Sequence, residues 1–149
     1  MDWYELLLSL HIIAAGLYLG SGIAIWVLSQ RILAVDPPAF GTFARQAGWW
    51  ASKAHPAAAV VLLLAGFGMV ADADIDFDTW IILGLIGWLA GGAVGGGGVG
   101  RAGRALEDAI TREDGAGIMT SANRLLLLAR VESAILILVI VDMVVKPGL

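Results

Sequence analysis

The feature that most constrains this chain is an apolar run over residues 6–28 that holds one ionisable side chain, His11. The hydrocarbon core of a bilayer is roughly 30 Å thick, and about 20 apolar helical residues cross it. The run is long enough to do so, and Arg31 follows it as a basic stop. It predicts a membrane-spanning helix over residues 3–33 with an imidazole inside the membrane.

Three further apolar runs of similar length follow the first, over residues 54–71, 80–100 and 125–145. Charged residues make up only 15% of the chain, whereas a typical soluble domain has about 25%. We therefore expect an all-α polytopic membrane protein, one domain over residues 1–149, folded as an up-down bundle of four transmembrane helices. The expected helices are 3–33, 50–71, 79–110 and 121–146.

Basic residues gather in two of the three predicted loops. Arg31, Arg45 and Lys53 follow the first run, and Arg101, Arg104, Arg112, Arg124 and Arg130 lie between or just inside the last two. Because positive residues concentrate on the cytoplasmic side, we expect a multi-pass protein of the plasma (inner) membrane with both termini outside. Acidic residues precede the first run where a signal peptide carries positive charge, so we expect that run to stay in the mature protein.

Several functions are disfavoured by composition. The chain has no cysteine, which excludes disulfides, thiolate nucleophiles and iron–sulfur clusters. Basic residues are not interleaved with aromatic ones, so we expect no nucleic-acid partner. The glycines at 95, 97 and 100 match a dinucleotide fingerprint but lack its βαβ context. Residues 72–78 resemble the opening of a calcium loop, but Phe77 stands where that loop needs glycine, so we expect a solvated turn whose Asp78 caps the third helix.

Glycines recur at helical spacing in the third run, on two adjacent ridges. One ridge holds Gly87, Gly91 and Gly95, and the other holds Gly92, Gly96 and Gly100. Small residues let helix backbones approach closely in membranes. With Gly16 and Gly20 of the first run, we expect Gly92, Gly96 and Gly100 to pack helices within the bundle. A homo-oligomer seam and room for a flat ligand are the alternatives.

The small and weakly polar residues of the first run lie at helical spacing from His11. They are Tyr4, Ala15, Tyr18, Gly22 and Ser29. Because residues spaced in this way share one face of a helix, we expect this face to turn toward protein rather than lipid.

Ionisable residues inside a bilayer are expensive and mark functional sites. In the predicted spans they are His11, His55, Arg130, Glu132 and Asp142. Two histidines in a membrane bundle suggest haem b, because imidazole is a common axial ligand of haem iron. At 1.5 Å per helical residue their predicted depths differ by about 10 Å, which disfavours ligation of one iron by both histidines. His11 alone stays a candidate axial ligand, with Asp142 at similar depth to fix its tautomer. There are two alternatives to haem ligation: His11 can pair with Asp142, or it can belong to a proton or ion path.

His55 and Glu132 have different interpretations from His11. His55 precedes Pro56, and we favour a helix-start or headgroup role over ligation. Glu132 falls near mid-membrane, where it can bind substrate, relay protons or pair with Arg130 of a neighbouring copy.

Residues 10–20 (LHIIAAGLYLG) and 141–147 (VDMVVKP) resemble the HemJ-type membrane protoporphyrinogen oxidases and related small four-helix bacterial membrane proteins. The resemblance implies a four-helix membrane fold in which His11 ligates haem b. Our hypothesis is a haem-associated redox or redox-accessory protein with His11 as the metal ligand and Tyr18, Glu132 and Asp142 in the cofactor site. The expected partners are the bilayer, a second copy, and a porphyrin or electron-transfer partner. The alternative is a non-enzymatic transporter, channel or assembly subunit.

Overall fold

The computed structural model describes residues 2–36 and 39–147, with residues 51 and 52 described by their backbone only. These residues form helices and connecting turns, with no strand among them. The helices are α1 (Trp3–Val35), α2 (Phe40–Asp72), α3 (Thr79–Gly92), the π-helix η2 (Ala93–Val99), α4 (Gly100–Thr111) and α5 (Gly115–Val145).

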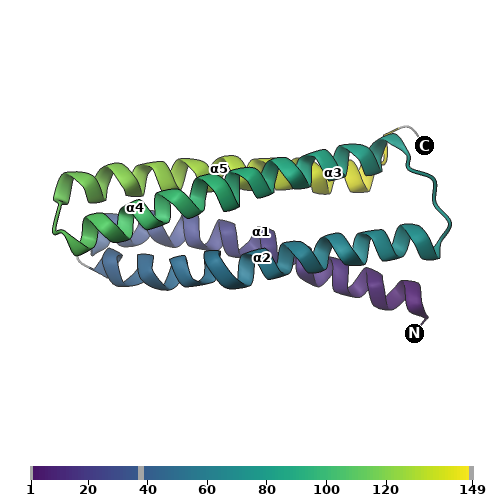
Figure 1. The fold of residues 1–149 in the computed structure, drawn as a ribbon, viewed down its shortest axis with the longest axis horizontal. Coiled ribbons are helices and arrows are strands. Elements are labelled where there is room, and N and C mark those ends of the chain that lie inside the picture. Colours follow the sequence, from purple (N-terminus) through teal and green to yellow (C-terminus); the bar gives the residue numbers. More distant parts are fainter. Residues whose placement is uncertain (1, 37–38, 148–149) are drawn as a thin grey trace.

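The helices form an elongated assembly of antiparallel rods (Figure 1). Helix α1 packs along α2, and α3, η2 and α4 together form one rod that packs along α5. The two halves meet through contacts of α1 with α5 and of α2 with α4. Both termini lie at one end of the assembly, and the α1–α2 and α4–α5 connections lie at the other (Figure 1).

Three stretches of the described chain are long and apolar enough to cross a membrane: Trp3–Val35, Phe40–Asp72 and Thr79–Thr111. Many large apolar side chains lie on the outside, among them Leu64 at 63% exposed and Leu138 at 67%. Such a surface is typical of contact with lipid rather than water. Helix α5 has 31 residues but carries Arg130, Glu132 and Asp142, so its apolar run is interrupted by charge.

Helix α2 begins at Phe40, well before the expected residue 50. The segment before Trp50 is helical because Phe40 and Phe43 lie one turn apart and pack on Leu106 of α4. The residues predicted to break the chain, Pro37 and Pro38, lie outside the described residues. Helix α1 ends just before them, and the Asp36 N–H donates to the Ile32 carbonyl.

Helix α5 also begins earlier than expected, at Gly115 rather than near residue 121. The cap is Asp114, whose side chain accepts from the Gly117 N–H at 3.0 Å, and not Thr120 or Ser121. Glu113 makes the preceding turn with a positive φ of 56°. The aspartate is a strong N-cap residue, so the turn between the last two rods is shorter than predicted. Asp78 does stand at the N-cap position of α3, but its side chain makes no capping bond there.

The glycine ridge that packs against α5 is not the one expected. A Cβ added at Gly84, Gly87, Gly91, Gly95 or Gly98 would contact Met143, Val139, Leu136, Glu132 or Leu128 of α5, respectively. A Cβ at Gly16, Gly20, Gly92 or Gly96 would meet nothing within 4 Å, and one at Gly100 only its own rod. The expectation of packing at those five positions within the chain was therefore wrong. For the glycines of the rod, the reason is the rotation of the rod about its own axis, which turns the adjacent face with Gly87, Gly91 and Gly95 toward α5.

This asymmetry predicts opposite effects for two matched substitutions. Gly87→Ala should destabilise the protein by about 1–2 kcal/mol, because the new methyl group overlaps Val139, a β-branched side chain that cannot easily turn away. Gly92→Ala should stabilise it by up to about 1 kcal/mol, because alanine is the better helix former and nothing opposes its methyl group. Thermal unfolding of both variants in detergent measures the difference. Equal midpoints would contradict the packing.

Candidate functional site

Three polar side chains from three helices meet inside the protein: Tyr18 of α1, His55 of α2 and Glu132 of α5. The His55 Nε2 atom lies 3.1 Å from Glu132 Oε1, and the Tyr18 hydroxyl donates to the same oxygen at 3.2 Å. The rings of Tyr18 and His55 are 4.1 Å apart. Tyr18 is 3% exposed and Glu132 is 5% exposed. Such a carboxylate needs these partners, because an unpaired buried charge is strongly unfavourable.

The glycine ridge makes room for this carboxylate. A Cβ at Gly95 would overlap the Glu132 carboxylate, so this position of η2 accommodates Glu132 only because it lacks a side chain. On the other side, Gly22 of α1 lies close to α5, where its Cβ would be 3.6 Å from Ser133 Oγ. The site is therefore a consequence of close helix approach on both sides of α5.

Ser21 extends the network behind His55. Its Oγ atom lies 3.3 Å from His55 Nδ1 and 3.2 Å from the Tyr18 carbonyl oxygen. A doubly protonated His55 donates to Glu132 and to Ser21, which leaves the serine hydroxyl free to donate to the Tyr18 carbonyl. With a neutral imidazole that donates through Nε2, the Nδ1 atom and the carbonyl compete for one hydroxyl proton. The hydrogen bonds that Ser21 makes therefore depend on which ring nitrogens of His55 carry a proton.

A cavity of about 590 Å³ extends from this network toward the α1–α2 and α4–α5 connections. Its wall includes His55, Gly95 and Glu132 at one end and Phe40 and Ile110 at the other. This volume lies in the range of small-molecule sites, which is roughly 300–1,000 Å³. Both hydrogen bonds to Glu132 go to Oε1, and no described residue donates to Oε2. The carboxylate therefore has an oxygen available to an occupant of the cavity.

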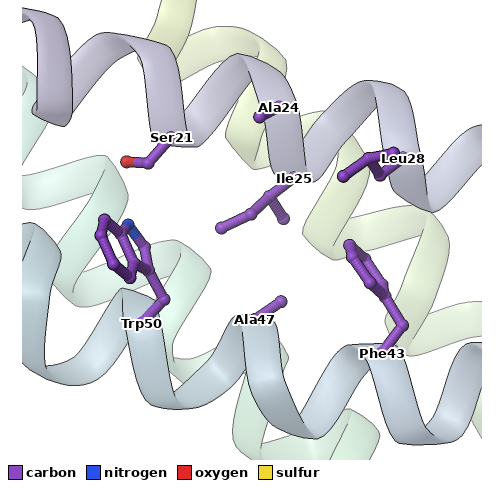
Figure 2. Close-up of a pocket in the computed structure, with 7 residues that line it drawn as sticks. All are labelled: Ser21, Ala24, Ile25, Leu28, Phe43, Ala47 and Trp50. Carbon is purple, nitrogen blue, oxygen red and sulfur yellow. The ribbon is translucent and has the colours of Figure 1, made fainter.

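A second, smaller hollow of about 210 Å³ lies between α1 and α2. Figure 2 shows its lining, Ser21, Ala24, Ile25 and Leu28 from α1 and Phe43, Ala47 and Trp50 from α2. We call it the α1–α2 groove. It is apolar apart from the Ser21 hydroxyl and the Trp50 indole nitrogen, which has no hydrogen-bond partner among the described side chains and backbone groups.

His11 lies apart from this site. Its Nδ1 atom is 2.9 Å from the Leu62 carbonyl oxygen, and its ring faces Gly66, where a Cβ would be 3.3 Å away. Neither cavity described above is lined by His11. Asp142, the expected partner of His11, does not bond to it, and the buried Asp142 Oδ2 has no partner in the described chain.

Of the sequence-predicted site residues, the structure brings Tyr18 and Glu132 together and leaves His11 and Asp142 elsewhere. The interpretation of His55 as a helix-start or headgroup residue was wrong, because it lies within α2 and bonds to Glu132. Pro56 suggested a helix start there, whereas it lies inside the helix. Within the chain Arg130 lies over the Trp26 ring, 5.4 Å from its centroid, and pairing of Glu132 with Arg130 of a neighbouring copy stays a prediction.

Among the described residues, no group of three or more His, Asp or Glu side chains could hold a metal ion. No protein family, curated protein or solved structure matches this chain.

The shared network predicts energetic coupling between His55 and Glu132. In a double-mutant cycle, His55→Gln and Glu132→Gln should be coupled by about 1–3 kcal/mol, because either change alone breaks the same contact. Unfolding in a detergent titration gives the four free energies. The matched cycle of His11→Gln with Glu132→Gln should be additive within about 0.5 kcal/mol, because His11 bonds to Leu62 instead. Equal coupling in both cycles would refute the network.

Proposed function

We propose that this chain is a proton-exchanging membrane carrier whose site is the Tyr18–His55–Glu132 cluster. In this proposal α1, α2, the α3–η2–α4 rod and α5 form an up-down bundle of four transmembrane helices in the plasma membrane. The cavity opens toward the cytoplasm and binds a small solute, and Glu132 and His55 give up or take a proton as the solute binds.

The distribution of charge supports the orientation. Both termini lie at one end of the molecule, and the α1–α2 and α4–α5 connections lie at the other (Figure 1). Arg31 and Arg45 flank the first of these connections in sequence, and Arg112 precedes α5 at the second. The positive-inside rule then puts the termini outside and the basic end in the cytoplasm. At the opposite end Lys146 lies over the Trp80 ring, 5.0 Å from its centroid, an arrangement typical of the membrane interface. A Cβ at Gly16 or Gly20 would meet nothing within 4 Å, so the proposal includes contact with a second copy of the chain at this face of α1.

One observation carries the functional proposal: the Glu132 carboxylate, buried among helices, lines a solute-sized cavity and contacts a histidine at 3.1 Å. Ionisable groups inside a membrane protein mark ion, proton and substrate paths. Histidine changes its charge near neutral pH, and a carboxylate beside it can accept its proton. The cavity gives this pair contact with water or solute, which a purely structural ion pair would not need.

A lipid-soluble carbodiimide tests the proton exchange without knowledge of the solute. Carbodiimides add to protonated carboxyl groups, so Glu132 should be labelled from the membrane phase once it takes up a proton. Mass spectrometry of peptides from treated vesicles should find the adduct at Glu132, and Glu132→Gln should lose it.

Two controls make that experiment decisive. Asp142→Asn should leave the adduct at Glu132 unchanged, because Asp142 lies outside the cavity lining. His55→Gln should change the labelling rate by about tenfold or more, since it removes the group that shares the proton. An unlabelled Glu132 over the whole range from acidic to neutral pH would overturn the proposal.

A second candidate function, haem b binding through His11, is favoured by a different observation. The Leu62 carbonyl accepts from Nδ1–H, which leaves Nε2 as the nitrogen with a free lone pair, the form that ligates a metal. The cavity large enough for a flat ligand borders His55 rather than His11, so the two candidates concern different sites. Bound haem would supply redox chemistry at His11, with Leu62 holding the ring.

Absorbance decides this second candidate. Protein purified from haem-replete cells should show a Soret band that His11→Ala abolishes and that the matched variant His55→Ala retains. A colourless wild-type protein removes haem from the proposal, and a band lost in His55→Ala but kept in His11→Ala would move the ligand to the cavity.

A further inference from the structure

We infer that the solute of the proposed carrier is a lipophilic amine that reaches Glu132 from the bilayer through the α1–α2 groove. The inference rests on the proposed function, because it takes the Glu132 cavity as the binding site. It adds the chemical class of the solute and its route.

The deep end of the cavity selects the polar group of the solute. Glu132 Oε2 is the acceptor that the site leaves without a donor, whereas Oε1 already takes two hydrogen bonds. The neighbouring Arg130 is stacked on Trp26, so within the cluster only a protonated His55 can balance the charge of the carboxylate. In the proposed exchange His55 gives up its proton as the solute binds. An ammonium group supplies the missing donor and a positive charge, and charge-assisted hydrogen bonds of this kind are the strong ones.

The walls of the cavity select the rest of the solute. Between the two ends of the cavity the lining is largely aliphatic and aromatic, and includes Ile25, Phe43, Val99, Leu125 and Ala129. Such a surface favours a hydrocarbon chain or ring system over a small polar ion. A lipophilic amine therefore matches both the polar end and the apolar wall.

The route follows from a wall that the two hollows share. Ile25, Phe43 and Ala47 line both the α1–α2 groove and the Glu132 cavity, so side chains alone separate them. Figure 2 shows these side chains projecting into the space between the two helices. On the outer side of the groove Leu28 is 49% exposed on the apolar surface of the protein. Ser21 belongs to the groove and also contacts His55.

Electrostatics favours this route over the aqueous one. Arg45 and Arg104 line the cavity and are exposed, about 15 Å from the Glu132 end at 1.5 Å per helical residue. They would repel a cation that approached from the cytoplasm, although Glu107 beside them offsets part of that charge. A lipophilic amine concentrates in the bilayer with its charge at the headgroups, and Arg45 and Arg104, which line the cavity, are not among the residues that line the groove.

Binding can be measured with a dansyl-labelled dodecylamine that keeps one primary amine, added to the full chain in phosphatidylcholine nanodiscs. Energy transfer from tryptophan reports occupancy. The amine should bind about tenfold or more tightly than its N-acetyl analogue, since acetylation removes the charged donor. Glu132→Gln should abolish this preference. Equal binding of the two probes to the wild type, or an unchanged preference in Glu132→Gln, overturns the solute class.

The route is tested by stopped-flow association of the same probe. Ala24→Trp should slow association by about tenfold or more and change the dissociation constant little, because Ala24 lines the groove but not the cavity. The matched control Val27→Trp places the same bulk on an exposed position of α1 outside the groove and should associate at the wild-type rate. An unchanged rate in Ala24→Trp overturns the lateral route.

The outcomes separate this inference from the proposed function. Carbodiimide labelling of Glu132 without amine binding keeps the proton-exchanging site and rejects the amine. Loss of both rejects the carrier itself.

Discussion

The structure depends on the burial of one carboxylate, Glu132, among helices that are long and apolar enough to cross a membrane. Moving a charge into a medium of low dielectric costs several kcal/mol unless partners compensate for it. Here the compensation comes from Tyr18 and His55, which belong to two other helices. The relative rotation and depth of α1, α2 and α5 are therefore coupled through a single oxygen atom. The same contact brings three protonatable side chains together at the edge of a cavity.

The glycine-rich rod is what makes this burial possible. Ordinarily glycine costs a helix up to about 1 kcal/mol per residue relative to alanine. One face of the rod offsets that cost by close packing on α5, and Gly95 on this face leaves the space that the Glu132 carboxylate fills. The backbone widens to a π-helix over the same stretch, which is a common feature of functional sites. The adjacent face, with Gly96 and Gly100, lines the cavity instead.

The two histidines illustrate how environment sets the role of one residue type. His11 is held by a backbone carbonyl between two apolar helices, an arrangement that fixes its ring and one tautomer. His55 contacts a carboxylate, a hydroxyl and an aromatic ring, so it belongs to a network of polar side chains from three helices. The proposed proton exchange concerns the second environment, and the second candidate function concerns the first. The two candidate functions are therefore properties of separate places in the fold.

The sequence by itself determined the all-helical class, the membrane-length apolar helices and the exclusion of cysteine chemistry, because hydropathy and composition are local properties. It also singled out Tyr18 and Glu132, since a tyrosine on a small-residue face and a charge in an apolar run are visible without coordinates. Only the tertiary structure decided that His55, not His11, joins them and that Gly95, not Gly96, faces α5. Helix periodicity shows which residues share a face, but the rotation and axial shift between helices come from packing between residues far apart in sequence. The start of α2 was missed for the same reason, because Phe40 is buried against Leu106 of α4. The start of α5 was missed for a local reason, because Asp114 caps the helix instead of Thr120 or Ser121.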